Sequence, residues 1–505
     1  MPPRQPHADG VDAGATDNTR LADGAGNRGA PVQARRIDQN DRHGRRLSTA
    51  RALMDARDVR LEPELAQRLA GRAAALAPLG SLSLDTVTLT PGELAALERL
   101  TERLANNYPY GEPRYVGQML KPPHPLAWAA YATAMLLNPN NHALDGGPAT
   151  AELEQEAVTA IAAMFGYGEP LGHLTSSGTI ANLEALWIAR ELRPDSAILF
   201  GENAHYTHGR MCEVLGVRAE SVPQDAFGRI DVAILERRLR AGGVGTVVAT
   251  LGTTSLGALD PIAEIAACCA QHGVRLHVDA AYGGFYTLLA DGGEPGVDRA
   301  PFDAVRLADS IVVDPHKHGL QPYGCGCVLF ADPAVGRLYA HDSPYTYFSS
   351  SELHLGEISL ECSRAGAAAA ALWATLEALP LTRAGLGSQL AASRAATLGL
   401  AHELEDSELA VVVTPALDII CPFPRLARAS QISARCERAF DSLAAAGWHA
   451  AKLRVRAGWL AQRHPWIECD ADEVTTLRMV LMKPAHAAIV EELAGVVREH
   501  LTLAR

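Results

Sequence analysis

The chain has 505 residues, of which 48% are hydrophobic and 20% are charged, a length and composition typical of a globular protein with more than one domain. Its formal net charge of −13 disfavours a general nucleic-acid-binding protein, which would usually be basic. The sequence has no run of about 18 apolar residues that would cross a membrane, and its first residues lack the apolar core of a secretion signal. We therefore expect a cytoplasmic protein with neither nucleic-acid nor membrane partners.

The N-terminal part of the chain divides into two segments. Residues 1–46 are rich in Gly, Asp, Asn, Arg and Pro and poor in large apolar side chains. Such a segment buries too little surface to offset the entropy lost on ordering, so we predict a disordered tail. Apolar residues at helical spacing follow from Leu61 to Ala70 and from Leu94 to Leu104. We assign residues 47–125 to an N-terminal helical segment.

Strands and helices alternate in the central part of the chain, residues 126–384. An apolar stretch ends at the turn signal Asn138–Asn141, and a helical pattern follows from Ala151 to Met164. Short apolar runs, many of them β-branched, then alternate with helical patterns. Continuous apolar strands separated by helices indicate a parallel or mixed sheet covered on both faces, within one large domain. The predicted strands are 197–200, 246–251, 274–278 and 311–313.

The pattern changes after Gly385, where a long Ala-rich helix begins. Further strands and helices predict a smaller α+β domain over residues 385–505: strands near 410–413, 418–421 and 477–481, a helix near 431–445 and a final helix. The nine cysteines include no Cys-x-x-Cys pair and no Cys/His cluster with zinc spacing. We therefore expect reduced thiols and no metal site.

Two of the predicted strands end in groups that have a joint chemical use. Strand 274–278 ends at Asp279, and strand 311–313 ends at Asp314-Pro315-His316-Lys317. Either charge alone is more often a surface charge at a strand end. Together they match the needs of pyridoxal 5′-phosphate (PLP), which requires a lysine for a Schiff base and an aspartate that keeps the pyridine nitrogen protonated. Such a lysine must have a pKa well below about 10.4, and burial or a neighbouring cation lowers it.

Three further segments contain groups that suit such a cofactor. Hydroxyl residues and a glycine at Thr175–Thr179 open a helix, and a helix N-terminus binds phosphate, although a simple N-cap is the commoner reason for this pattern. His205 follows a strand and could stack on a flat ring, although a lone histidine is more often structural. Thr253 and Thr254 follow strand 246–251 beside a glycine, which fits either the edge of a cofactor or a Ser/Thr turn.

These motifs occur in the same order in the group II PLP-dependent amino-acid decarboxylases, which the chain resembles from about Arg114 to Pro484. Three segments look most like the bacterial tyrosine-type branch: Tyr115–Met119, Asn138–Asn141 and Pro148–Thr150. The resemblance implies an α/β protein of PLP-dependent transferase fold type I. Its large domain would have a mixed, mostly parallel seven-stranded sheet, followed by the smaller C-terminal domain. The resemblance also implies a homodimer with active sites shared between the subunits.

The resemblance implies a role for each candidate residue. Lys317 would form the Schiff base, Asp279 would pair with the pyridine nitrogen, and His205 would stack on the ring near the substrate. Ser177–Thr179 and His316 would hold the phosphate, and Thr253 or Thr254 would lie near the ring edge. The full cofactor-binding set is Ser177, Gly178, Thr179, His205, Thr253, Thr254, Asp279, Ala281, Asp314, His316 and Lys317.

A loop tyrosine completes the implied catalytic set. In this family a mobile loop carries a tyrosine that protonates the carbanion after CO₂ leaves. The matching segment here is Ser343–Phe348, and we place the acid at Tyr345 ahead of Tyr347. Either tyrosine could instead be an aromatic anchor that packs the loop. The catalytic residues would then be Lys317, His205, Tyr345 and Asp279.

Three positions depart from the family pattern and leave the substrate open. His318 follows the lysine where aromatic decarboxylases often have Trp or Met, and Lys483 precedes a proline where relatives often have Asn. Lys121 is either a solvated surface charge, which we favour, or a partner for an acidic substrate. We expect decarboxylation of an L-amino acid to the amine and CO₂. An aromatic substrate such as tyrosine comes first and an acidic one such as glutamate or aspartate second.

Two other functions are compatible with much of this pattern. An aldehyde synthase or a carbon–carbon lyase of the same fold would share the cofactor, but a tyrosine in the loop favours decarboxylation over the synthase reaction. A catalytically inactive homologue with a binding or regulatory role would not need both Asp279 and Lys317, and the chain retains both.

Overall fold

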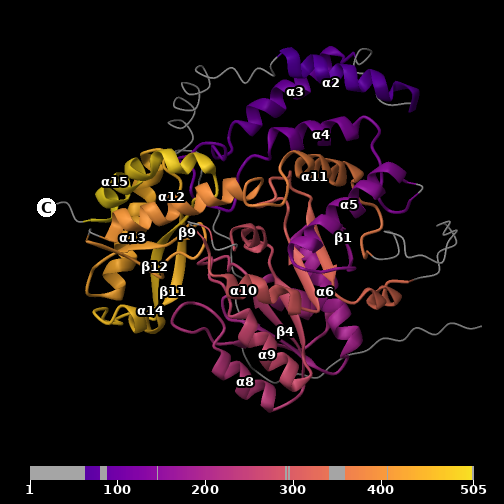
Figure 1. The fold of residues 1–505 in the computed structure, drawn as a ribbon. Coiled ribbons are helices and arrows are strands. Elements are labelled where there is room, and N and C mark those ends of the chain that lie inside the picture. Colours follow the sequence, from indigo (N-terminus) through magenta and orange to yellow (C-terminus); the bar gives the residue numbers. More distant parts are fainter. Residues whose placement is uncertain are drawn as a thin grey trace, which may run out of the picture. The chain divides into compact units, whose positions relative to one another are not determined.

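A computed structural model describes residues 63–502 except 80–87, 145, 291–292, 294–295, 341–358 and 406–407 (Figure 1). These residues belong to one unit of the chain, Leu61–Arg505. The predicted tail, residues 1–46, and the predicted loop acids Tyr345 and Tyr347 therefore lie outside the described residues.

Helices precede the central sheet, as the sequence predicted. Helix α3 begins with a capping box, in which the Thr90 side chain accepts from the Glu93 N–H and the Glu93 carboxylate accepts from the Thr90 N–H. Proline occupies the first helical position, where a backbone N–H would have no acceptor within the helix, so proline loses no hydrogen bond there. The elements are α2 (Pro63–Leu76), η1 (Ala77–Leu79), α3 (Pro91–Leu104), α4 (Pro125–Met135) and α5 (Pro148–Met164).

A seven-stranded sheet in the order β1-β7-β6-β5-β4-β2-β3 forms the centre of the fold. Strand β7 runs antiparallel to both of its neighbours, whereas the other neighbouring pairs are parallel. The predicted mixed, mostly parallel sheet is therefore confirmed. The strands are β1 (Leu171–Thr175), β2 (Ala197–Gly201), β3 (Ala219–Val222), β4 (Val244–Thr250), β5 (Arg275–Asp279), β6 (Ser310–Val313) and β7 (Gly326–Phe330).

Helices cover both faces of this sheet, which explains why its central strands are apolar throughout. Successive residues of a strand point to opposite faces. In β6, Val312 packs in one apolar cluster with Ile188 of α6, whereas Ile311 belongs to another cluster with Ile265 of α9. The helices and turns between the strands are α6 (Gly178–Leu192), α7 (Thr207–Leu215), α8 (Val232–Arg240), α9 (Ile262–His272), η2 (Gly284–Leu289), α10 (Arg299–Ala304), η3 (Val305–Leu307) and η4 (Pro333–Leu338).

The C-terminal part of the chain adds helices and two small antiparallel sheets, β10-β8 and β11-β12-β9. The predicted helices and strands of this region are present, but the exact domain boundaries stay a prediction. The elements are α11 (Gly366–Ala378), α12 (Gly387–Glu405), β8 (Leu409–Val411), β9 (Ile419–Ile420), β10 (Pro422–Pro424), α13 (Ala429–Ala445), β11 (Ala451–Arg456), α14 (Ala457–Arg463), β12 (Glu473–Val480), η6 (Pro484–Ile489) and α15 (Val490–Leu501).

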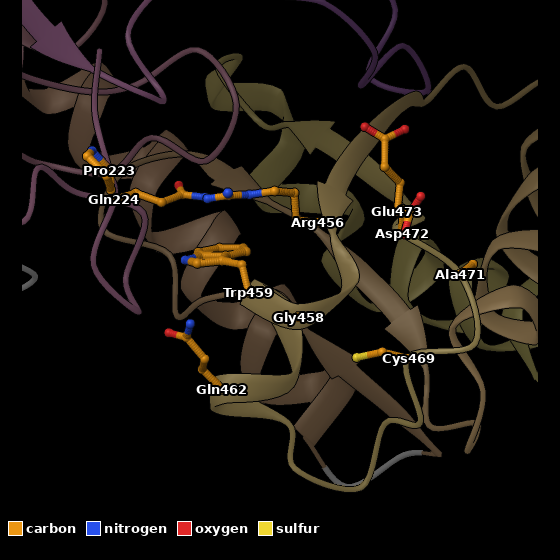
Figure 2. A pocket seen from close by; sticks show the side chains of 10 residues that line it. All are labelled: Pro223, Gln224, Arg456, Gly458, Trp459, Gln462, Cys469, Ala471, Asp472 and Glu473. Atoms are coloured by element: carbon orange, nitrogen blue, oxygen red, sulfur yellow. The ribbon is translucent and has the colours of Figure 1, made fainter. Parts of the chain in front are cut away.

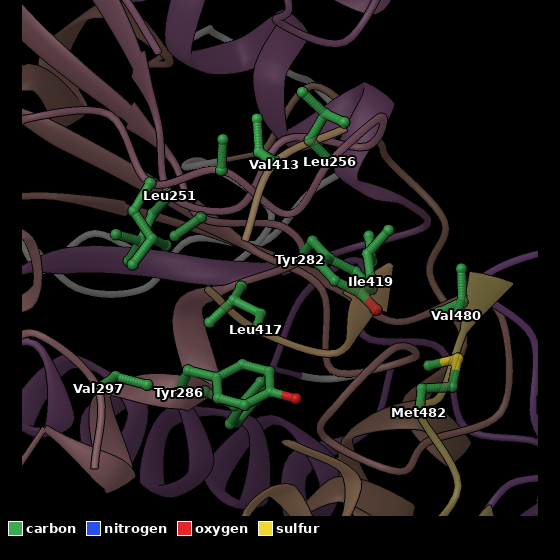
Figure 3. Close-up of a cluster of buried hydrophobic side chains, with 14 of the residues drawn as sticks. Leu251, Leu256, Tyr282, Tyr286, Val297, Val413, Leu417, Ile419, Val480 and Met482 are labelled. Atoms are coloured by element: carbon green, nitrogen blue, oxygen red, sulfur yellow. The ribbon is translucent and has the colours of Figure 1, made fainter. Parts of the chain in front are cut away.

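An apolar cluster joins these small sheets to the loops at the carboxyl ends of β4 and β5 (Figure 3). Leu251 and Tyr282 from these loops are buried in one cluster with Leu417, Ile419 and Val480 from the C-terminal part. The burial of these side chains holds the C-terminal part against the edge of the sheet at which polar side chains gather.

The described residues show neither a membrane helix nor a metal cluster. No helix among them is both long and apolar enough to cross a bilayer. They contain no group of three or more His, Cys, Asp or Glu side chains that could hold a metal ion. All nine cysteines are described, and all of them are free thiols.

Candidate active site

A cavity of about 270 Å³ lies at the carboxyl ends of the parallel strands, the edge at which open α/β sheets bind ligands. Its position follows from the sheet order, because β4, β5 and β6 are neighbours and end together. The cavity is lined by Ser177, Gly178, Thr179, Asn182, His205, Tyr206, Thr207, Thr250, Gly252, Thr254, Asp279, Ala281, Tyr282, Asp314, His316 and Lys317. The fold thus brings Asp279 and Lys317 into one site.

Asp279 presents an ionised carboxylate to this cavity. Its side chain is buried; its Oδ2 lies 2.9 Å from Nε2 of His208, and its Oδ1 accepts from the Ala281 N–H at 3.1 Å. Burial alone would raise the pKa of Asp279. The hydrogen bond and charge of His208, the charge of Lys317 and the Ala281 N–H outweigh burial and hold this pKa well below its ordinary value. A permanent anion at this position can accept from a pyridinium N–H.

Lys317 lies in a tight turn that follows β6, with its N–H donating to the Asp314 carbonyl at 2.9 Å. Its Nζ is 3.0 Å from Asp314 Oδ2. The other Asp314 oxygen is buried and has no hydrogen-bond partner among the described residues. Only glycine fits at position 178, since a Cβ there would lie 2.5 Å from Asp314 Oδ2. The turn therefore packs closely against the N-terminus of α6.

The N-terminus of α6 forms the end of the cavity at Ser177–Thr179. Ser177 is the N-cap, and its side chain accepts from the Ile180 N–H at 3.4 Å, so the simple capping role is confirmed. A capped helix still has free N–H groups in its first turn, and its dipole favours an anion there. His316 lines the same cavity, and its Nδ1 donates to the Cys325 carbonyl at 2.8 Å. These groups suit a phosphate.

His205 is neutral, and its Nε2 carries the ring proton. Its Nδ1 accepts from the Thr207 N–H at 3.2 Å, so the proton of the neutral ring is on Nε2. Burial lowers the pKa of His205, and the charges of Lys317 and His208 lower it further, whereas that of Asp279 opposes them. A neutral imidazole at the cavity wall can both stack on a ring and donate a hydrogen bond.

Of the two threonines predicted to lie near the edge of the cofactor ring, only Thr254 lines the cavity. Thr254 lines the cavity, next to Gly252, whose φ of +97° favours glycine. Thr253 is buried within the loop, where its hydroxyl accepts from the Ala258 N–H at 3.0 Å, and it is not among the lining residues. Apart from Thr253, the structure brings the whole predicted cofactor-binding set to the cavity.

His208 is a residue at the site that the sequence pattern did not single out. It lies in the first turn of α7, only three residues after His205, and is completely buried. Neither its spacing nor its neighbours in the sequence distinguish it from an ordinary core histidine. Its contact with Asp279 depends on the packing of α7 against the end of β5, which is a tertiary feature.

Two of the three positions that depart from the family pattern, His318 and Lys121, interact with Asp418, which is buried behind the cavity. His318 Nε2 lies 3.3 Å from Asp418 Oδ2, and Tyr282, which lines the cavity, donates to Asp418 Oδ1 at 2.6 Å. The Lys121 ammonium interacts with the charges of both Asp418 and Lys483.

The favoured interpretation of Lys121 as a solvated surface charge is wrong. Lys121 is partly buried, and its Nζ donates to the Met482 carbonyl at 3.3 Å. Burial lowers the pKa of Lys121 to about 8, although the charge of Asp418 opposes this shift. The sequence pattern gave no sign of this burial, because the segment that covers Lys121 comes from the far end of the chain.

Lys483 is expected to make the stability of the protein depend on pH. Burial, and then the charge of Lys121, lower its pKa to about 8, whereas an unfolded lysine titrates near 10.4. Between these values the unfolded chain binds more protons, so the contribution of Lys483 to the free energy of unfolding rises with pH by about 3 kcal/mol. In urea unfolding at pH 7.5 and 10.5, the free energy of unfolding of the wild type minus that of Lys483→Met should therefore increase by about this amount.

The matched control for this measurement is Lys452→Met, because Lys452 is a partly exposed lysine that pairs with Glu437. We expect the difference in unfolding free energy between the wild type and Lys452→Met to stay nearly constant across this range. A constant difference for Lys483→Met as well would show that Lys483 titrates normally in the folded protein.

A larger hollow of about 960 Å³ lies elsewhere, between Pro223–Gln224 and the C-terminal part (Figure 2). Most of its lining side chains are exposed, and its arginine, Arg456, pairs with Glu202 at 2.7 Å. It contains no lysine next to a buried carboxylate, so the smaller cavity at the sheet edge is the candidate active site.

The cavity at the sheet edge fits PLP on three independent points. Its buried anion Asp279 has an oxygen available to a ring nitrogen, Lys317 supplies a primary amine, and the N-terminus of α6 suits a phosphate. The orphaned buried oxygen of Asp314 gives an additional acceptor beside Lys317. The fold and the site together define a PLP-dependent enzyme.

Comparisons with known proteins agree with this class. The family model described as the pyridoxal-dependent decarboxylase conserved domain matches residues 125–407. The "Probable L-tyrosine/L-aspartate decarboxylase" of Methanothermobacter thermautotrophicus is 31% identical over 316 residues, 62% of this chain and 83% of that protein. The "Probable L-aspartate decarboxylase" of Halobacterium salinarum is 33% identical over 282 residues, 55% of this chain and 75% of that protein.

A solved structure supports the fold. The crystal structure of "Oryza sativa TDC with PLP and tryptamine" superposes with a TM-score of 0.71 at 18% identity, covering 94% of this chain and all of that one. The chain belongs to the pyridoxal-dependent decarboxylase family. It is a PLP-dependent carboxy-lyase of fold type I that acts on an amino acid.

Proposed function

We propose that this enzyme decarboxylates an aromatic L-amino acid, with tyrosine as the first candidate, at the cavity of Asp279 and Lys317. The observation that best supports this substrate class is the scarcity of cationic side chains among the residues that line the cavity. Among the described lining residues, Lys317 is the only lysine or arginine, and it is committed to the Schiff base. Lys121, the cation considered for an acidic substrate, donates to the Met482 carbonyl instead. An acidic side chain would therefore lack a strong cationic partner there, whereas an aromatic side chain needs none.

Each group at the cavity has a distinct role in this proposal. Bound PLP supplies a cationic ring that accepts the electron pair of the breaking carbon–carboxylate bond. Asp279 would keep the ring nitrogen protonated, and the N-terminus of α6 with His316 would hold the phosphate. Lys317 would supply the primary amine that binds the cofactor. His205, as a neutral side chain with its proton on Nε2, would orient the substrate.

The relative from Halobacterium salinarum supports an acidic substrate as the second candidate, since its printed name specifies aspartate. A screen of the twenty common amino acids for CO₂ release in the presence of PLP distinguishes the two. The proposal predicts the highest kcat/KM for tyrosine or another aromatic amino acid. Preference for aspartate or glutamate would overturn the aromatic assignment. Release of ammonia and peroxide together with CO₂ would instead identify an aldehyde synthase.

We also propose Tyr345 as the acid that protonates the product carbanion. Tyr345→Phe removes only the phenolic proton and should lower amine formation by on the order of 10²-fold or more, whereas Tyr347→Phe should change it by less than about threefold. Amine and aldehyde are measured by chromatography in the same reactions. The opposite pattern would assign the role to Tyr347, and no loss in either variant would move it outside this loop.

Helix α3 supports the proposal that the enzyme is a homodimer. None of the described α3 side chains is buried, and the exposed fraction of Leu94, Leu97, Leu100 and Leu104 is 49–56%. A row of half-exposed leucines on one helix is typical of a surface that a second protein chain covers. Light scattering of the wild type should give the mass of a dimer. The double variant Leu97→Glu, Leu100→Glu should dissociate into monomers at higher concentrations than the wild type. A monomeric wild type would overturn the proposal of a homodimer.

The cytoplasmic location of the protein stays a prediction.

A further inference from the structure

We propose that His208 is a positioning residue that aims the Asp279 carboxylate at the ring nitrogen of the cofactor. This inference rests on the proposed function of the cavity. His208 does not line the cavity, since it is completely buried and is not among the lining residues. It acts through Asp279, with 2.9 Å between its Nε2 and Asp279 Oδ2.

The hydrogen bonds around His208 determine which nitrogen carries its proton. An ionised carboxylate only accepts, so the His208 nitrogen that faces Asp279 is the donor. The other nitrogen, Nδ1, is buried and has no partner among the described residues. Nε2 of His208 is therefore the nitrogen that donates to Asp279.

Two donors then fix the plane of the carboxylate. Oδ1 of Asp279 accepts from the Ala281 N–H, and Oδ2 accepts from His208. The terminal torsion of an aspartate has a broad energy minimum, so one donor alone would leave the group free to rotate. With a donor on each oxygen, the carboxylate of Asp279 is held in one orientation, so its remaining lone pairs point in a fixed direction. Without His208, Asp279 would also lose the largest contribution that opposes the effect of burial on its pKa.

The chain offers a matched control in His277. This histidine is as deeply buried as His208, and the two ring centroids are 6.4 Å apart. Its ring nitrogens lie 2.9 Å from Asn182 Oδ1 and 2.8 Å from Ser310 Oγ, so it does not use Asp279 as a partner. Replacing His277 measures the general cost of altering a buried histidine at this place in the fold.

The test compares two amide variants of His208. The amide nitrogen of His208→Gln reaches about as far as Nε2, whereas that of His208→Asn reaches only as far as Nδ1. We expect His208→Asn to raise the dissociation constant for PLP by roughly tenfold or more, the effect of losing one hydrogen bond to a charged group. His208→Gln and His277→Gln should stay within about threefold of the wild type. Fluorescence titration of the apoprotein gives these constants, and thermal unfolding checks that each variant is folded.

The outcomes separate this inference from the proposed function. Equal PLP affinity in His208→Asn and His208→Gln would overturn the role of His208. A loss in His277→Gln as large as that in His208→Asn would also overturn it, because the effect would then be one of packing. If the wild type bound no PLP, or if Asp279→Asn bound PLP as the wild type does, the proposed function of the cavity would itself fail.

Discussion

Lys317→Ala is expected to lose the visible absorption band of the PLP-loaded enzyme and to slow turnover by on the order of 10³-fold or more. Lys317 is the only lysine among the described residues that line the cavity, so no other amine is in place to form the Schiff base. The absorption spectrum of the purified variant and its rate of CO₂ release with the best amino acid measure the two effects.

Lys121→Met is the control for this change, because Lys121 is a partly buried lysine near the site that does not line the cavity. It should keep the visible band. Retention of the band in Lys317→Ala, or its loss in Lys121→Met, would contradict the assignment of Lys317.

Asp279→Asn should reduce kcat by on the order of 10²-fold or more while the protein stays folded. The asparagine side chain keeps the size of the carboxylate but carries no charge, so it cannot hold the ring nitrogen protonated. Because that protonation makes the ring an electron acceptor, kcat should fall much more than KM rises. Single-turnover measurements of CO₂ release separate the chemical step from product release.

The matched control is Asp260→Asn. Asp260 is also a buried aspartate, in the segment that follows β4. Its carboxylate accepts from the N–H groups of Thr250 and Ile230, and it does not line the cavity. Its substitution should lower the melting temperature and leave kcat of the folded enzyme nearly unchanged. An unchanged kcat in Asp279→Asn would show that the ring nitrogen has no need of this anion.

Much of the fold could be predicted because its central strands are apolar on both faces. Strands β4, β5 and β6 have this pattern, and all three were predicted close to their observed limits. Strand β3 was missed because only one of its four residues is buried. Strands β1 and β7 were missed because they contain glycine, histidine or cysteine among their apolar residues. These strands are stabilised by their neighbours in the sheet, which a local pattern does not show.

The residues of the candidate site likewise fall into those that local sequence patterns predict and those that they do not. Asp279 and Lys317 could be predicted because they end recognisable strands and because parallel strands end at one edge. His208 and Asp418 could not, since their partners come from segments distant in the sequence. Lys121 was misjudged for the same reason: the Met482 carbonyl that accepts from it lies 361 positions away. Buried polar contacts of this kind depend on packing between elements, and no spacing rule encodes them.

Reduction of the PLP-loaded enzyme with borohydride, followed by peptide mass spectrometry, tests the central claim most directly. Borohydride converts a Schiff base between lysine and PLP into a stable secondary amine, so the modified lysine can be identified. The cavity of Asp279 and Lys317 predicts one pyridoxyl group per chain, on the peptide that contains Lys317. A pyridoxyl group on another lysine, or none on a protein that releases CO₂ from an amino acid, would contradict the account.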